Sequence, residues 1–71
     1  MGPEGMKRRL YLLIEDLEAQ AKEVRVQAAK QGVSPEQLLH RDGSYVMTPI
    51  LLAQAQALAA LQSLQASEKK R

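Results

Sequence analysis

The densest group of residues that could do acid–base or nucleophilic chemistry lies near the middle of the chain. It holds an imidazole, a guanidinium, a carboxylate, a hydroxyl and a phenol, in the order His40, Arg41, Asp42, Ser44 and Tyr45. Nucleophilic catalysis also needs a base within hydrogen-bond reach of the nucleophile, in a pocket that excludes water. A chain of 71 residues offers little concavity, and Asp-Gly is a preferred turn pair. We therefore predict a turn here, with His40 at a helix end and Tyr45 anchoring the loop, in a protein that is not an enzyme.

The acidic residues of the N-terminal half do not suggest a paired-carboxylate site. Glu15, Asp16 and Glu18 are close in sequence, but consecutive positions of a helix point in different directions. Metal binding has equally little support, because the chain has no cysteine and a single histidine, His40. We predict no catalytic residue, no metal site and no cofactor.

The elements that position these residues follow from the spacing of the apolar side chains. From Met6 to Gln31, apolar residues recur at alternating steps of four and three, which is typical of one face of an amphipathic helix. They are Leu10, Ile14, Leu17, Ala21, Val24 and Ala28. On the polar side, Glu18 and Lys22 have the spacing of an i,i+4 ion pair. Gly32 follows, and glycine commonly ends helices in the left-handed conformation.

At two places a residue with a side-chain hydroxyl directly precedes a proline, and these dipeptides predict where the other helical segments begin. Ser34-Pro35, with a glutamine three residues after the serine, forms a capping-box pattern that predicts a short helix over about 35–40. Residues 45–47 are predicted to form an extended, partly buried strap. Thr48-Pro49 repeats the cap and proline pattern and predicts a second long helix over about 49–67. Its predicted contact stripe comprises Ile50, Ala53, Ala57, Ala60, Leu61 and Leu64.

These elements predict an all-α fold, an antiparallel hairpin of two long helices over residues 6–67 with a short helical turn in the connector. We expect residues 1–5 to be disordered or vector-derived and residues 68–71 to form a basic C-terminal tail. No apolar segment begins the chain, which favours a cytoplasmic location over secretion. The second helix has no charge before Glu68, but its glutamines lie all around it, which argues against a membrane span.

Both helices carry more apolar side chains than one hairpin can bury. A second set of apolar residues lies away from the predicted contact face of each helix. The set comprises Leu12, Ala19, Val26, Leu51, Leu52, Ala55, Leu58 and Ala59. We predict that it mediates self-association, as a dimer forming a four-helix bundle, or docking onto another protein. Scattered surface hydrophobes are the alternative interpretation.

An antiparallel hairpin also gathers basic residues from both termini at one end. They are Lys7, Arg8, Arg9, Lys69, Lys70 and Arg71. Such an end would attract phosphates or acidic partners, so a small nucleic-acid-binding regulator is the alternative function. However, cations at a helix C-terminus also complement the helix dipole, and the formal net charge is only +2. No nucleic-acid-binding motif is present, so a non-enzymatic protein–protein interaction module is the favoured hypothesis.

Overall fold

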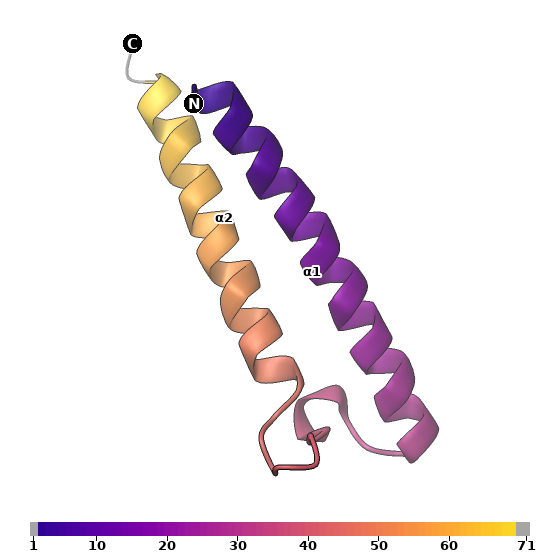
Figure 1. The fold of residues 1–71 in the computed structure, drawn as a ribbon. Helices are drawn as coiled ribbons and strands as arrows, with labels where there is room; N and C mark the ends of the chain where they lie inside the picture. Colours follow the sequence, from indigo (N-terminus) through magenta and orange to yellow (C-terminus); the bar gives the residue numbers. More distant parts are fainter. Residues whose placement is uncertain (1, 70–71) are drawn as a thin grey trace.

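The computed structural model describes residues 2–69 and contains two long helices that run antiparallel. Helix α1 spans Pro3–Gln31, a 3-10 turn η1 spans Pro35–Gln37, and helix α2 spans Met47–Lys69. Figure 1 shows the first turn of α1 beside the last turn of α2, with the connector at the opposite end. The predicted all-α hairpin is confirmed.

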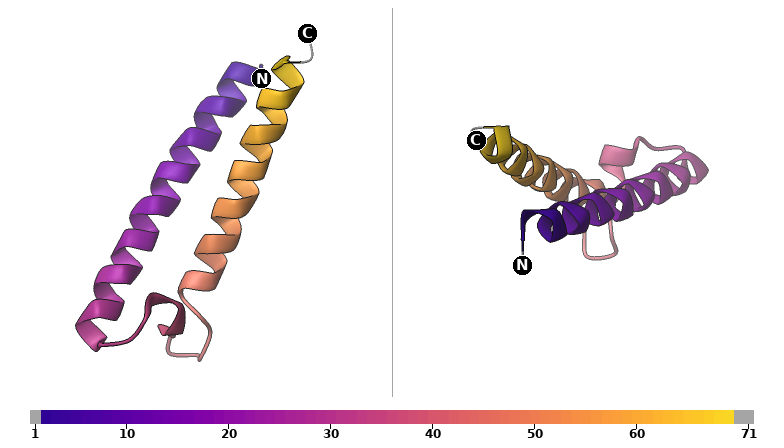
Figure 2. Two further views of the ribbon diagram at one scale, coloured as in Figure 1. Left: turned by 180° about the vertical axis from the view of Figure 1, so that it is seen from behind. Right: turned by 90° about the horizontal axis from the view of Figure 1, so that it is seen from above.

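The hairpin is a single layer of two helices, as the views in Figure 2 show. It measures 50 × 18 × 15 Å and has a Cα radius of gyration of 15.5 Å. A compact domain of this length has a radius of gyration of about 11 Å. Two helices in one layer cannot enclose a core, so each buries only the stripe that faces the other.

Helix α1 buries the seam that its apolar spacing predicts. Leu17, Ala21, Val24 and Ala28 are buried, while Leu10 and Ile14 are half-buried. The helix begins at Pro3, three residues before the predicted start, so most of the segment expected to be disordered is helical. Proline suits the first helical turn because its missing N–H would have no partner there.

The predicted C-terminus of α1 at Gly32 is confirmed. Gly32 has a φ of 70° in the left-handed region, and its N–H donates to the carbonyl of Ala29 at 3.2 Å. The N–H of Val33 donates to the carbonyl of Ala28 at 3.1 Å. This pair of bonds is the Schellman arrangement, which satisfies two carbonyls that the end of the helix would otherwise leave unpaired.

The connector differs from its prediction at the short helix. Turn η1 ends at Gln37, and the side chain of Ser34 makes no capping hydrogen bond, so the predicted capping box and the helix to residue 40 are wrong. After η1 the chain is extended, and Leu39 pairs with Tyr45 in an isolated antiparallel bridge. The predicted strap therefore has a backbone partner that sequence reasoning did not supply.

The connector closes over a cluster of buried side chains. Met47, only 2% exposed, forms a buried cluster with Ala21, Val24 and Leu38. Tyr45, the predicted anchor, is 54% exposed, so Met47 holds the connector instead. A thioether on an unbranched side chain can fill the irregular gap between a helix and a loop.

Helix α2 is longer at both ends than predicted. It begins at Met47 and already includes Thr48, so the cap predicted for Thr48 is wrong. It continues through Lys69, which places residues 68 and 69 in the helix and not in a tail, while residues 70 and 71 lie outside the described part. Ala57 and Leu61 of the predicted stripe are buried, whereas Ala60 is exposed.

Both helices were tested for the ability to span a membrane, within residues 2–69. No helix there combines the length and the apolar character needed to cross a bilayer. The glutamines of α2 account for this, because an amide in hydrocarbon needs a partner that a single helix does not supply.

The burial of Met47 leads to a matched test of the fold. Met47→Ala should lower the free energy of unfolding by about 2–5 kcal/mol, because it leaves a cavity in the packed cluster. Met6→Ala makes the same chemical change at a side chain that is 46% exposed and should cost less than about 1 kcal/mol. Urea unfolding followed by circular dichroism at one protein concentration measures both. Equal losses would contradict the packing described.

Candidate interaction surfaces

The potential acid–base residues of the connector belong to an exposed turn. Gly43 has a φ of 86°, a conformation that favours glycine. Oδ1 of Asp42 accepts hydrogen bonds from the Ser44 hydroxyl at 2.6 Å and from the Ser44 backbone N–H at 2.9 Å. The hydroxyl and then the backbone N–H hold the pKa of Asp42 below its usual value. The hydroxyl of Ser44 is thus engaged within its own turn.

The hydrogen bonds of Asp42 predict a measurable titration effect. Ser44→Ala should raise the pKa of Asp42 toward its usual value of about 4, but only part of the way, because the backbone N–H remains. Since the folded pKa is depressed, the stabilisation that the turn gains is present at neutral pH and is lost as the pH falls through the folded pKa. An NMR titration of Asp42 measures this shift, and an unchanged pKa in the variant would contradict the assignment.

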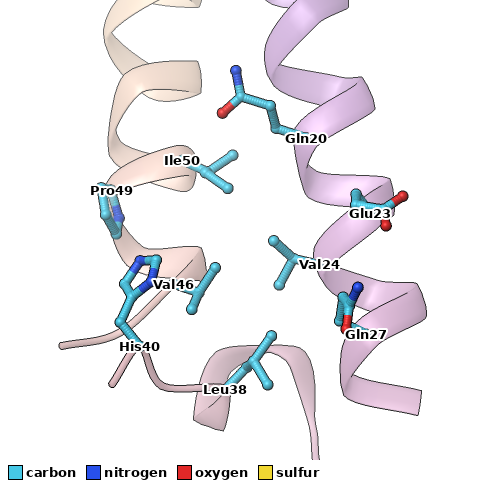
Figure 3. Close-up of a pocket in the computed structure, with 9 residues that line it drawn as sticks. All are labelled: Gln20, Glu23, Val24, Gln27, Leu38, His40, Val46, Pro49 and Ile50. Atoms are coloured by element: carbon cyan, nitrogen blue, oxygen red, sulfur yellow. The ribbon is translucent and has the colours of Figure 1, made fainter. Parts of the chain in front are cut away.

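An apolar groove lies where the connector meets the two helices (Figure 3). Val24 of α1 and Ile50 of α2 point toward one another across it, and Leu38 points up from the connector. Leu38 and Val24 belong to the buried cluster, and Val46 and Ile50 pack against that cluster. The side chain of His40 lies at the rim. The groove is therefore the outer edge of this buried cluster.

Within residues 2–69, no group of three or more His, Asp or Glu side chains is placed to hold a metal ion.

The predicted self-association surface divides into parts that face different directions. All eight of its residues are exposed, with Leu12 at 58% and Leu52 at 59%. At about 100° per residue, the row of Leu12, Ala19 and Val26 lies opposite the buried seam of α1. The row of Leu52, Ala55 and Ala59 likewise lies on the side of α2 away from α1. These two rows point in opposite directions and do not form one surface.

The two outer rows also differ in their surroundings. The α1 row has charged neighbours along its length, at Arg8, Glu15, Glu23 and Lys30. Helix α2 carries no charged residue from Met47 to Ser67. Exposed leucines among charged side chains are ordinary surface residues. The exposed apolar side chains that stand out therefore belong to α2.

Leu51 and Leu58 occupy a third position, on the flank of α2 and not on its outer side. Leu51 is 45% exposed and Leu58 is 47% exposed. Gln54 lies between them in sequence, at helical steps of three and four, so the three side chains share one side of α2. The same side is continuous with a shallow hollow between the helices, because Gln54 lines that hollow together with residues of α1.

Besides Ala19, the α1 side of that hollow is formed by four charged residues, which sequence reasoning did not group as one surface. They are Glu15, Glu18, Lys22 and Arg25, and all four are exposed. The predicted ion pair between Glu18 and Lys22 does not form, and none of the four is ion-paired to another residue of the described chain. Their order, two acids followed by two bases at steps of three, four and three, was the available signal.

The basic end is partly neutralised by an acidic residue. Nζ of Lys7 lies 2.6 Å from Oε2 of Glu68, and this is the one ion pair within residues 2–69. The hydrogen bond to Glu68 raises the pKa of Lys7. Arg8 and Arg9 are exposed, Lys69 is the last described residue, and the predicted contacts at residues 70 and 71 lie outside the described part. The antiparallel arrangement of the helices thus pairs Lys7 with a carboxylate of α2.

The Lys7–Glu68 pair predicts a local effect at the open end. Lys7→Gln should speed amide hydrogen exchange in the first turns of α1 and the last turn of α2, while global stability changes little, because exposed pairs are screened by water. Arg8→Gln removes the same charge from the next residue and serves as the control. Because the pKa of Lys7 is raised, the pair should persist to alkaline pH and be lost only as the pH passes that raised pKa. Equal exchange in the two variants would argue against the pair.

Comparison with known proteins finds no match for this chain among protein-family models, curated proteins or solved structures.

Proposed function

We propose that this protein is a non-enzymatic protein–protein interaction module that works as a self-associated helical hairpin, most simply a dimer. The observation that carries the proposal is the exposed, uncharged surface of α2, where Leu51, Leu52 and Leu58 are 45%, 59% and 47% exposed. A helix that is apolar on more than one face is normally covered on more than one face. Helix α1 covers only one.

The accessible surface of the hairpin supports this proposal. It measures 5579 Å², whereas a compact monomer of 7.9 kDa exposes about 4,400 Å². The excess of about 1,200 Å² is larger than the roughly 800 Å² that each partner contributes to an interface of standard size. A hairpin of this shape can therefore bury a full interface against a second helical body.

Nucleic-acid binding through the basic end is the alternative function, and it has less support. Lys7 is already paired with Glu68, and the hollow at this end is lined by Glu4 as well as by Lys7 and Arg8. Binding to phosphates would release counterions and weaken steeply with salt. Tight, salt-sensitive binding of DNA or RNA by a monomeric hairpin would favour this alternative.

Sedimentation equilibrium over a micromolar concentration range tests the proposed function. The wild type should show a reversible shift from monomer to dimer mass. Leu51→Gln with Leu58→Gln should favour the monomer, because both changes place amides at the proposed contact, while Leu12→Gln with Val26→Gln, on the outer side of α1, should leave the equilibrium unchanged. Circular dichroism confirms that each variant is helical. A wild type that stays monomeric at the highest concentration would overturn the proposal.

A further inference from the structure

We infer that the partner of this hairpin is a second copy of the chain, docked antiparallel on one defined side of the molecule. This inference rests on the proposed function and names the contact face and its register. The face, called here the twofold face, comprises the charged residues Glu15, Glu18, Lys22 and Arg25 of α1 with Leu51 and Leu58 of α2.

The six residues share one side of the hairpin. On α1, steps of three, four and three keep the four charged residues on one side of the helix. On α2, Leu51 and Leu58 stand one step of three or four from Gln54. Gln54 and the four charged residues line the same hollow between the helices. The twofold face is therefore continuous across both helices.

The four charged residues of α1 in the twofold face form a self-complementary pattern. Glu15 and Arg25 lie five residues on either side of Gln20, and Glu18 and Lys22 lie two residues on either side of it. If a second α1 lies antiparallel with its Gln20 at the same level, each acid faces a base of the other copy. Opposite charges directly across an interface set register and suppress wrong pairings.

The leucines of α2 are symmetric about the same level of the hairpin. The Lys7–Glu68 pair sets residue 7 beside residue 68, and both helices rise about 1.5 Å per residue. Gln20 of α1 and Ala55 of α2 are each thirteen residues inward from that pair, so they lie at the same level of the hairpin. Leu51 and Leu58 lie almost equally far before and after this level, so one rotation axis relates both sets of residues.

A single twofold axis produces the whole contact. The axis lies between the two copies at this level, perpendicular to the helices and parallel to the line from α1 to α2. It lays α1 on the partner's α1 and α2 on the partner's α2, with each pair antiparallel. Glu15 then faces the partner's Arg25, and Leu51 packs beside the partner's Leu58. Both contacts arise from one surface patch meeting its own copy, as a closed symmetric dimer requires. The product is a four-helix bundle.

Two further observations identify the occupant as a second copy and not an unrelated protein. The four charges have no ion-pair partner in the described part of the hairpin, so they are available to an arriving molecule. A partner that satisfies all of them must carry two bases and two acids in the reverse order, and this chain carries that pattern itself. Beyond the charges, Tyr11 and Ala29 lie nine residues on either side of Gln20, which places a large side chain opposite a small one.

A charge-swap cycle tests the register in the full-length chain. Glu18→Lys and Lys22→Glu should each raise the dimer dissociation constant about tenfold or more, because the axis repeats each like-charge contact twice. The double variant E18K/K22E should return to within about threefold of the wild type, since the pairs re-form with reversed sign. Glu23→Lys changes the net charge as E18K does, but it lies outside the twofold face and should have little effect.

Mixing two oppositely charged variants provides a second readout. E15K/E18K makes all four positions basic, and K22E/R25E makes all four acidic. Each variant alone should be monomeric at concentrations where the wild type dimerises, and an equimolar mixture should form a heterodimer that salt weakens. Circular dichroism of each variant verifies the fold. The changes are at exposed positions, where substitutions leave the packed stripe intact.

Cysteine cross-linking reports the geometry directly, because the chain has no cysteine of its own. Gln54→Cys lies beside the axis and should form a disulfide-linked dimer on mild oxidation. Gln56→Cys lies on the opposite side of α2 and should not. If the wild type dimerises but the charge variants keep its dissociation constant and Gln56→Cys cross-links preferentially, the twofold face is wrong while the proposed function stands. A monomeric wild type would overturn both.

Discussion

Two helices in one layer can each cover only one side of the other, and the surface chemistry of this protein follows from that limit. Leu17, Ala21 and Val24 of α1 are buried because α2 and the connector lie over them. Every other side of both helices is open to water. The charged side chains of α1 suit this exposure, whereas the uncharged face of α2 does not, so α2 is the helix for which a partner must be sought.

The connector buries apolar side chains beyond those that the two helices bury against each other. Met47 and Leu38 extend the buried stripe into a small cluster at one end, and the Lys7–Glu68 pair fastens the other. Between these two ends the contact buries Leu17 of α1 with Ala57 and Leu61 of α2, and the small side chain of the alanine lets the helices approach closely. We infer that the hairpin is firm at its connector and gains further stability when a second copy covers the flank of α2.

Much of this structure could be predicted from the sequence, and the exceptions have physical causes. The seam of α1, its end at Gly32 and the antiparallel arrangement follow from local spacing and backbone preference. The capping patterns at Ser34 and Thr48 misled. Leu38 leaves η1 in an extended conformation and is buried in the cluster, and Met47, buried in the same cluster, is already the first residue of α2. The hollow that joins Gln54 to the charges of α1 depends on how the two helices are rotated against each other. That rotation becomes visible only once the partner face of each helix is known.

The central claim is that a second copy of the chain covers the flank of α2. Isotope-filtered NMR on a mixture of labelled and unlabelled chains detects contacts between protomers and ignores those within one. The account predicts intermolecular nuclear Overhauser effects between the methyl groups of Leu51 and the partner's Leu58, with none from Leu12. Intermolecular contacts from Leu12 and Val26, or none at concentrations where a dimer is present, would contradict it.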